Sequence, residues 1–341
     1  MKYKVTIGIP VFRVEKYIRR TMESVLSQTY PDIEFLLIDD GSDDQSLEII
    51  KSIQKTHPRG AAIRVLSHSH NMGVSDTRNH IIDEAHGEFL YFVDSDDVIA
   101  HDTISLLMHQ IEQHNVDVAF GSYERIEMSG ERSLFQYPAR IFEDSDSFAD
   151  FVYRSYAGFQ ASACNFLVRL SLIRAHQLRF YKSDFWEDMV FTLNLSTFAE
   201  RVALLPNITY TYLCRENSLS NSWNKDIIAK ERIVQYFEAV DSLKQDDGNL
   251  NKRPFFPNRC YIAVMSDIYI ICNIIKKRAY INPPFTVREL HAHLRHPANF
   301  REIMSFRKRR PQNLMLYLLW KAPARASILA IRLFAKWKGL I

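Results

Sequence analysis

The feature that most constrains this chain is an apolar run that ends abruptly in acidic residues. Residues 89–93 (Phe-Leu-Tyr-Phe-Val) have the composition of a buried strand, and Asp94, Asp96 and Asp97 follow directly. Strands of open parallel sheets are buried on both faces, and ligands bind just beyond their carboxyl ends. Carboxylates crowded at such an edge repel one another unless a cation neutralises them, and Mg²⁺ or Mn²⁺ prefers oxygen ligands of this kind. The run therefore predicts a site for a divalent metal and a diphosphate. The alternative is an acidic turn that precedes the next helix.

Strand-like and helix-like segments alternate through the first 120 residues. The strand-like runs are residues 5–12, 33–38, 62–66, 89–93 and 116–120, and the segments with helical periodicity are residues 14–26, 42–57, 73–86 and 103–114. Short links between alternating strands and helices require right-handed crossovers between parallel strands. The order predicts an open α/β sheet whose first, second and fourth strands end in polar or acidic residues at one edge.

Local signals predict where two of these helices begin and end. Ser42 and Gln45 have the spacing of a capping box, and Pro58 would end the helix that they start. Gly87 would close the next helix as a C-terminal glycine.

The composition limits the class of protein. Its 341 residues, 47% of them apolar, can bury the core of one large domain or of one domain with an appendage. The four cysteines lack Cys-x-x-Cys spacing and no secretory signal precedes them, so we expect reduced thiols in a cytoplasmic protein. No stretch reaches the roughly 18–20 apolar residues that span a bilayer. No Gly-x-Gly-x-x-Gly or Gly-Lys-Ser/Thr loop follows a strand, which disfavours the usual dinucleotide-binding and P-loop proteins.

An ordered set of motifs carries a family resemblance. The motifs are Pro10-Val11-Phe12, Glu15-Lys16-Tyr17-Ile18, residues 24–29 (Ser-Val-Leu-Ser-Gln-Thr), Asp39-Asp40-Gly41-Ser42, Asn71-Met72-Gly73, Thr77-Arg78-Asn79 and residues 92–97 (Phe-Val-Asp-Ser-Asp-Asp). In this order and spacing the chain resembles family 2 glycosyltransferases of bacterial cell-surface glycan synthesis, with Arg13 where the family usually has Asn. The resemblance is close over residues 3–125 and extends to about residue 222. It implies the inverting GT-A fold, an open, mixed and mostly parallel sheet, in a domain of residues 1–222. Residues 223–341 would then form a helical extension.

The resemblance also implies a site. The donor-binding residues would be Pro10, Val11, Phe12, Glu15, Asp39, Asp40, Gly73, Arg78, Asp94, Ser95 and Arg215. Asp40 would accept the N3–H of uracil if the donor is a UDP-sugar, whereas Asp39 could serve only to cap a turn. Asp94 would contact the ribose or sugar, and Asp96, with Asp94, would hold Mn²⁺ or Mg²⁺ against the diphosphate. Arg78 would contact the donor or brace the acidic edge; the alternative is a surface ion pair of little energetic value.

A second acidic pair lies in residues 184–191 (Asp-Phe-Trp-Glu-Asp-Met-Val-Phe), at the start of a helix whose apolar residues we expect to face one way. The resemblance implies that Asp188 is the general base, with Glu187 beside it. An inverting transfer needs a carboxylate within about 3 Å of the acceptor hydroxyl, while a metal stabilises the leaving diphosphate. The alternative is an acidic first turn that the helix dipole favours.

Residues 210–220 resemble the family segment in which a strand enters a loop. Arg215 would contact the diphosphate or an acceptor phosphate, and Ser218 and Ser220 would cap or close the loop.

The C-terminal part carries no family motif. Residues 226–245, 257–278 and 286–307 have helical periodicity, and residues 246–249 look like an exposed break. From Arg301 onward ten Lys and Arg face one acidic residue, which places +9 here and leaves about −6 for residues 1–300. Apolar stretches broken by basic residues suit a helix in the headgroup layer of an anionic leaflet. The alternative is a helix hairpin docked on the catalytic domain or on a second copy, as in a homodimer. An acidic body without nucleic-acid motifs argues against nucleic acid.

The sequence therefore predicts a metal-dependent inverting glycosyltransferase, peripheral at the inner face of the cell membrane. It would transfer a hexosyl or N-acetylhexosaminyl group from a nucleotide-sugar, with a UDP-sugar favoured, to a glycan or lipid-linked glycan. Two alternatives remain at this point: a non-enzymatic, magnesium-binding α/β module that resembles a receiver, and a sugar nucleotidyltransferase.

Overall fold

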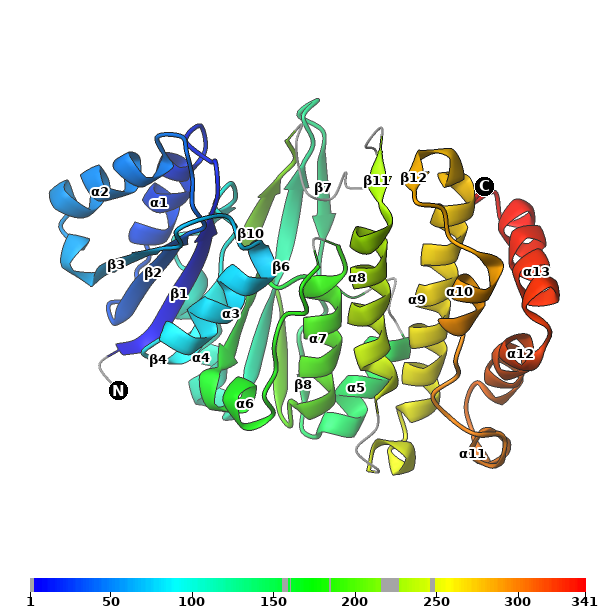
Figure 1. The fold of residues 1–341 in the computed structure, drawn as a ribbon. Helices are drawn as coiled ribbons and strands as arrows, with labels where there is room; N and C mark the ends of the chain where they lie inside the picture. The colour runs from blue at the N-terminus through cyan, green and yellow to red at the C-terminus, as the bar shows by residue number, and fades with distance from the viewer. Residues whose placement is uncertain (1–2, 155–158, 160, 184, 216–226, 246–248) are drawn as a thin grey trace. The chain divides into compact units, whose positions relative to one another are not determined.

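The computed structural model describes residues 3–154, 159, 161–183, 185–215, 227–245 and 249–341. The chain divides into two compact units (Figure 1). The first unit comprises Met1–Phe148, Ser162–Phe180 and Leu195–Ser218, and the second comprises Ala149–Ala161, Tyr181–Asn194 and Leu219–Ile341. The domain boundary expected after residue 222 lies outside the described residues, as do Ser218, Ser220 and the break at 246–248.

The described strands of the first unit form one sheet in the order β3-β2-β1-β4-β9-β6-β10-β5. On this path the strands are β1 (Tyr3–Val11), β2 (Ile33–Asp39), β3 (Ile63–Ser67), β4 (Gly87–Phe92), β5 (Val98–Ile99), β6 (Val118–Ile126), β9 (Phe166–Arg169) and β10 (Val202–Leu213). Two further strands, β7 (Arg132–Phe135) and β8 (Arg140–Phe142), pair with β6 and β10.

The strand directions make this sheet mixed and mostly parallel. Strand β1 runs parallel to β2 and to β4, with Val5 opposite Ile33 on one side and Phe89 on the other. Strand β9 lies antiparallel between β4 and β6, and β6 runs parallel to β10. The predicted α/β class is confirmed, including the common edge at which β1, β2 and β4 end.

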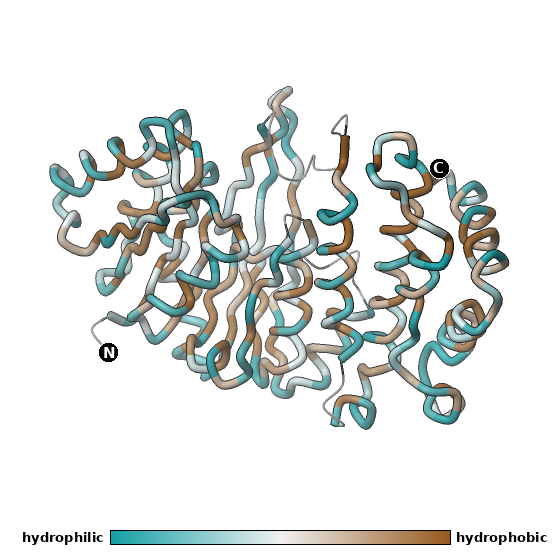
Figure 2. The backbone as a smooth tube through the Cα atoms, viewed as in Figure 1, coloured by the Kyte–Doolittle hydropathy of each residue, from teal (hydrophilic) through white to brown (hydrophobic). Residues whose placement is uncertain are grey.

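Amphipathic helices connect these strands. They are α1 (Ile18–Leu26), α2 (Ser46–Thr56), α3 (Val74–Glu84), α4 (Thr103–His114) and the short α6 (Leu170–Ala175). Helix α1 buries Ile18, Met22 and Val25, which recur three or four residues apart, as expected for one helix face against a core. The strands carry continuous hydrophobic stretches (Figure 2). Two other helices, α5 (Ser145–Arg154) and α7 (Glu187–Phe198), each contribute residues to both units.

The helix start at Ser42 and the helix end at Gly87 were wrong, whereas α2 does end just before Pro58, as predicted. Helix α2 begins at Ser46 without a side-chain cap. The Ser42 hydroxyl instead accepts the backbone N–H of Arg13 at 3.0 Å. Gly87 is the first residue of β4, and α3 ends earlier, at Glu84. A Cβ on Gly87 would lie 2.5 Å from Thr6 N, so this glycine permits close approach of β4 to β1 rather than capping a helix.

The second unit is mostly helical. Its helices are α8 (Lys230–Asp241), α9 (Phe256–Lys276), α10 (Val287–Ala292), α11 (Phe300–Ser305), α12 (Arg310–Lys321) and α13 (Ala324–Trp337), and the two-residue strands β11 (Ile228–Ala229) and β12 (Ile281–Asn282) pair in parallel. The single helix expected over 286–307 is wrong. It is two short helices with capping boxes at Thr286 and Asn299, because Pro297, between them, cannot continue a helix. Within the described ranges, no helix has the length and apolar character that crossing a bilayer requires.

Candidate active site

The acidic turn follows β4 at the edge that β1 and β2 share. Backbone hydrogen bonds fix this edge: Val93 N donates to Gly8 O at 3.0 Å, and Asp40 N donates to Val11 O at 2.8 Å. Within the turn, Asp97 N donates to Asp94 O at 3.1 Å. The parallel register therefore brings the turn after β4 and the Asp39-Asp40 pair after β2 to one end of the sheet.

Helix α1 holds the acidic turn from one side. The Thr21 hydroxyl is fully buried and lies 3.0 Å from Ser95 O and 2.8 Å from Asp97 O. The Arg20 guanidinium donates to Asp96 O at 3.3 Å. These contacts from α1 bind only backbone oxygens of the turn and do not involve the carboxylates of Asp94 and Asp96. Ser95 itself is buried.

Strand β10 holds the same turn through Asp97. Tyr210 Oη donates to Asp97 Oδ2 at 2.7 Å and accepts from Asp94 N at 3.2 Å. Leu213 N donates to Asp97 Oδ1 at 2.8 Å. Asp97 is 1% exposed and both of its oxygens have partners in the fold. It is therefore a structural anchor for the turn rather than a ligand-binding group.

Burial and neighbouring negative charge raise the pKa values of two carboxylates of the turn, Asp96 and Asp97. Burial raises the pKa of Asp97 well above its usual range, and the charges of Asp96 and Asp94 add to this effect. Burial and the charge of Asp94 also raise the pKa of Asp96, although Arg215 acts in the opposite direction. The site therefore has an excess of negative charge that a further cation would relieve.

Two arginines reach this cluster. Arg215 forms an ion pair with Asp96, and its guanidinium lies 5.4 Å from the centre of the Tyr17 ring. Arg78 donates to Asp94 Oδ1 at 2.9 Å and lies over the ring of Phe180. Because the Arg78 side chain is only 6% exposed, this pair is not a solvated surface contact. Both arginines face the acidic turn, where they can also contact an anionic ligand.

The donor set suits a divalent cation that shares its ligands with a substrate. Among the described residues, no group of three or more His, Cys, Asp or Glu side chains converges as a complete metal site. Magnesium, however, commonly uses one or two carboxylates together with substrate phosphates. Asp94 and Asp96 supply two hard oxygen ligands, and burial together with the charge of Asp94 raises the pKa of Asp96. The residues present fit Mg²⁺ or Mn²⁺.

The Asp39-Asp40 pair forms the other side of the edge. The Asp40 carboxylate lies 2.7 Å from His68 Nδ1 and accepts from Met72 N and Gly73 N, each at 2.8 Å. It is 3% exposed and fixes the loop that precedes α3. Asp39 Oδ2 accepts from Ser42 N at a long 3.4 Å, and Oδ1 is buried without a hydrogen-bond partner in the described part of the chain. Asp39 can therefore accept further hydrogen bonds, whereas most acceptor positions of Asp40 are already occupied.

The predicted pocket residues after β1 divide into two groups. Pro10 and Val11 are buried within β1, so their side chains belong to the core. Phe12 is 37% exposed, and Glu15 is exposed and accepts the N–H of Gln45 at 3.0 Å. Phe12 and Glu15 therefore remain available at the surface of this edge.

Arg13 stands at a backbone position that suits the Asn usual in the family. It has φ of 49°, in the left-handed region that Asn adopts more readily than Arg. Two hydrogen bonds to Asp43, of 2.7 and 2.6 Å, hold the guanidinium and raise the pKa of Arg13 while lowering that of Asp43.

Glu187 and Asp188 lie in the first turn of α7, within the second unit. Glu187 is buried, and Asp188 Oδ1 accepts the N–H of Met189 at 2.6 Å. The expectation that the apolar residues of this helix face one way was wrong. Buried residues occupy every side of α7, as in helices that are enclosed by other elements.

Sequence reasoning missed the residues that support the turn. Thr21, Tyr210 and His68 contact it or Asp40 from other elements, and no local pattern marks them. Tyr210 begins the segment 210–220, for which the sequence predicted roles only at Arg215, Ser218 and Ser220. Its hydroxyl partner Asp97 is 113 positions away. Only the register of β10 in the sheet reveals this contact.

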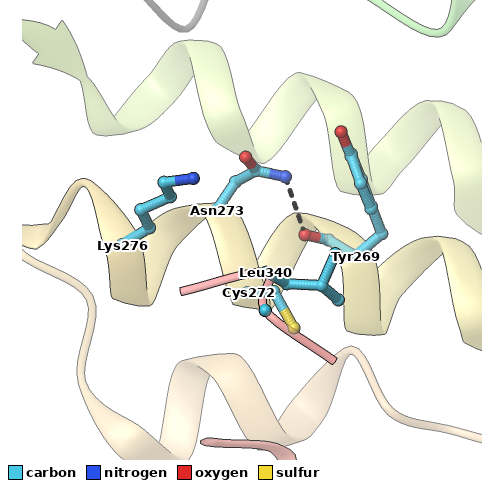
Figure 3. A pocket seen from close by; sticks show the side chains of 6 residues that line it. Tyr269, Cys272, Asn273, Lys276 and Leu340 are labelled. Atoms are coloured by element: carbon cyan, nitrogen blue, oxygen red, sulfur yellow. Dashed lines mark hydrogen bonds between the residues drawn. The ribbon is translucent and has the colours of Figure 1, made fainter. Parts of the chain in front are cut away.

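A separate pocket of about 170 Å³ lies in the second unit (Figure 3). Its lining residues are Tyr269, Cys272, Asn273, Lys276, Gly339 and Leu340. Asn273 Nδ2 donates to Tyr269 O at 3.0 Å within α9. With one cation and no carboxylate, this pocket offers neither a metal ligand nor a general base.

Comparison with known proteins identifies the family. The model of glycosyl transferase family 2 matches residues 6–176. The chain is 32% identical to the uncharacterized glycosyltransferase EpsJ of Bacillus subtilis, over 68% of this chain and 67% of EpsJ. It is 27% identical to the cholesterol galactosyltransferase of Borreliella burgdorferi, over 82% of this chain and 80% of the relative. It is 30% identical to glycosyltransferase GlyA of Streptococcus pneumoniae over 65% of its own length, but it spans only 32% of GlyA.

The fold comparison agrees with the family. The crystal structure of S. aureus TarS 1–349 in complex with UDP-GlcNAc superposes with a TM-score of 0.65 at 20% identity and covers 96% of this chain and 89% of that one. The receiver-like and nucleotidyltransferase interpretations were wrong. The mixed sheet, the acidic turn after β4 and the matched residues 6–176 establish that this chain belongs to glycosyl transferase family 2 and is a glycosyltransferase with the GT-A fold.

Proposed function

We propose that this enzyme transfers a hexosyl or N-acetylhexosaminyl group from a UDP-sugar to a glycan or lipid-linked glycan, with inversion, in the synthesis of a cell-surface polysaccharide. One observation carries the proposal. The carboxylates of the turn after β4, which face Arg78 and Arg215, share a sheet edge with the Asp39-Asp40 pair. UDP-GlcNAc is bound by TarS, which has the same fold, and a relative is the poly(ribitol-phosphate) beta-glucosyltransferase of Bacillus spizizenii.

At the nucleotide end, Phe12, Glu15, Asp39 and Asp40 surround the proposed base and ribose position. Asp40 was expected to accept the uracil N3–H, yet three donors already occupy its carboxylate. A carboxylate has about four acceptor positions, so one remains. Asp39 Oδ1, which has no partner among the described residues, offers a second acceptor. Asn substitution at each position would show which carboxylate binds the base, because only the true acceptor loses preference for UDP over CDP.

At the diphosphate end, Asp94 and Asp96 would hold Mn²⁺ or Mg²⁺. The bound ion supplies charge stabilisation for the leaving diphosphate. Arg215 and Arg78 pair with the two carboxylates in the ligand-free fold, and both would contact phosphate oxygens of the bound diphosphate. Asp97 and Thr21 keep the turn rigid, so that binding does not have to order it.

At the acceptor end, Asp188 is the proposed general base and Glu187 its neighbour. Asp188 takes the proton of the acceptor hydroxyl as that oxygen forms a bond to the anomeric carbon and the bond from this carbon to the UDP oxygen breaks. Support comes from the family membership and from the acidic pair that begins α7. Such a base needs a carboxylate within hydrogen-bond reach of the acceptor hydroxyl.

The proposed setting is the cytoplasmic face of the cell membrane, where a lipid-linked acceptor would be found. The C-terminal helices are the proposed contact with the anionic membrane surface, and self-association through them is the competing expectation. Nucleic acid is not a proposed partner.

Donor binding is tested by thermal shift with UDP, CDP and GDP, each with Mn²⁺ and again with EDTA. UDP with Mn²⁺ should stabilise the protein, by about 2.7 kcal/mol when UDP is at a hundredfold excess over its dissociation constant. Asp96→Asn should abolish the metal-dependent part of this shift. An equal shift for all three nucleotides would contradict the UDP assignment, and an EDTA-insensitive shift would contradict the metal.

The base is tested by Asp188→Asn. Transfer should fall by more than a hundredfold, while the UDP-induced thermal shift is unchanged. The matched control is Glu231→Gln, because Glu231 lies in the first turn of α8. If Asp188 serves only the helix dipole, both variants will lose a few tenths of a kcal/mol of stability and keep full transfer activity.

A further inference from the structure

The helices α12 and α13 have one face that is already covered. Leu316 of α12 and Ile331 and Ala335 of α13 are buried in the hydrophobic core of the second unit, together with residues of α8 and α9. The Ser327 hydroxyl, also buried, donates to Leu319 O at 2.6 Å and ties the two helices together. These contacts fix the rotation of α13 about its axis, and so determine which residues face outward.

The outward face of α13 is apolar along its length. Leu329, Leu333 and Trp337 are 55%, 60% and 76% exposed. Their spacing of four residues places them on one side of the helix, away from Ile331 and Ala335. On α12, Met315 and Leu318 are also more than half exposed. Large apolar side chains that are exposed in a row, rather than singly, mark an interaction surface.

Cations accompany this apolar row. Arg325, Arg332 and Lys336 are exposed on α13, and no ion-pair partner for them exists within the described residues. Arg332 and Lys336 occur between the three apolar positions in the sequence, so hydrophilic and hydrophobic residues alternate along the helix (Figure 2). Residues 301–341 carry ten Lys and Arg and one Glu. The surface is therefore apolar and strongly positive at once.

The positive charge of this surface favours an anionic membrane over a second copy of the chain as its partner. A second copy docked through the same face would bring Arg325, Arg332 and Lys336 close to the same three cations, which disfavours a symmetric dimer. An anionic bilayer accommodates both properties, since the apolar side chains enter the boundary between headgroups and acyl chains while Lys and Arg stay among the phosphates. The 14 residues of α13 extend about 21 Å, too short for the roughly 30 Å of a hydrocarbon core. A helix of this length can lie on a leaflet but cannot cross it.

We propose that Leu329, Leu333 and Trp337 insert into the headgroup layer of an anionic leaflet, with Arg325, Arg332 and Lys336 on the lipid phosphates. The helix lies parallel to the membrane plane and is held there by its covered face. This deepens the peripheral location proposed above and is independent of the donor, metal and base assignments.

Sedimentation of the full chain with vesicles tests this inference. Vesicles of phosphatidylcholine alone are compared with vesicles in which phosphatidylglycerol replaces part of it. Each basic residue near an anionic surface contributes about 1 kcal/mol, or about fivefold in affinity. The double variant Arg332→Gln, Lys336→Gln should therefore bind anionic vesicles about 30-fold more weakly. Its matched control is Lys51→Gln, Lys55→Gln, which removes two exposed cations of equal spacing from α2 and should bind as the wild type does.

The apolar part is tested by Leu329→Ser, Leu333→Ser. This variant should lose vesicle binding at all salt concentrations, whereas wild-type binding should weaken as salt rises. Sedimentation velocity on the same preparations reports self-association. Wild-type binding that does not distinguish the two vesicle types would overturn the proposal. So would an apolar variant that dissociates an oligomer and still binds vesicles, since the face would then be a subunit interface.

The UDP thermal shift, measured on every variant, keeps this proposal separate from the function proposed above. A variant that loses vesicle binding but retains the UDP shift and the wild-type circular dichroism is folded, and supports the inference. A wild type that shows no UDP shift but binds anionic vesicles would contradict the donor assignment alone.

Discussion

Tyr210 provides a sharp test of how the acidic turn is held. Its hydroxyl donates to Asp97 at 2.7 Å and accepts from Asp94 N at 3.2 Å, and both Tyr210 and Asp97 are nearly inaccessible to solvent. Tyr210→Phe keeps the ring but leaves a buried carboxylate oxygen and a backbone N–H without this partner. A lost bond to a charged group costs about 1.5–3 kcal/mol and a neutral one about 1 kcal/mol. We expect a loss of about 3 kcal/mol, or about 150-fold in the folding equilibrium.

Tyr91→Phe is the matched control. Tyr91 is also fully buried in the same sheet, but its hydroxyl donates to the neutral amide oxygen of Asn165 at 3.3 Å. Its loss should cost about 1 kcal/mol. Urea unfolding followed by circular dichroism measures both. Equal costs for the two variants at pH 8 would refute the argument, because the difference rests on the charge of Asp97, which grows as the pH rises.

The pH dependence of the Tyr210→Phe cost gives a second readout. Burial raises the pKa of Asp97 well above its usual range, and the Tyr210 hydrogen bond partly counteracts this. The variant should therefore raise that pKa further. When the pKa of a carboxyl is higher in the folded than in the unfolded state, the free energy of unfolding decreases as the pH rises between these two pKa values. The cost of Tyr210→Phe should be larger at pH 8 than at pH 5, and the reverse order would contradict the assignment.

Three further predictions concern stability. Gly87→Ala places a Cβ 2.5 Å from Thr6 N and should cost about 1–3 kcal/mol in urea unfolding; a neutral result would mean that β4 can shift. Burial raises the pKa of Asp267 to about 7 in spite of its ion pair with Lys244, so stability should fall as the pH rises from 5 to 8. Asp267→Asn should flatten this profile, which thermal unfolding across pH would show. Arg59 donates to four backbone carbonyl oxygens of residues 26–31, and Arg59→Lys should cost about 2 kcal/mol of unfolding free energy; an unchanged urea midpoint would contradict this.

The fold was predictable where burial decides it. Residues 33–38, apart from Glu34, and residues 89–93 are apolar because both faces of the parallel sheet are covered. The structure places them in or directly after β2 and β4, the two strands that flank β1. The prediction failed where the decisive contact was distant. Gly87 resembles a helix cap locally, but the backbone of Thr6, 81 positions away, is what requires a glycine there. A capping box at Ser42 failed for the same reason, since Arg13 binds its hydroxyl.

The candidate site shows the same division. The position of Asp94 and Asp96 at one sheet edge could be predicted from sequence, because they follow a buried strand directly. Their role as ligands stays a prediction. Their partners could not be found in this way. Arg215 and Tyr210 reach the turn from more than 100 positions away, and only strand order brings them there. The assignments of Asp188 as base, of the metal and of the base-binding carboxylate stay predictions.

Strand β9 has a consequence for how the chain can be divided. It supplies only four residues, Phe166–Arg169, yet it is the hydrogen-bonding neighbour of both β4 and β6. A truncated chain that ends before residue 166 would expose the backbone edges of two long apolar strands, and unpaired edges of this kind recruit other chains. During synthesis these edges stay open until the ribosome has released residue 169. A chain that ends before residue 166 should therefore precipitate when expressed alone. Extension to residue 169 would pair the edge of β4 but leave open the edge of β6 that β10 covers.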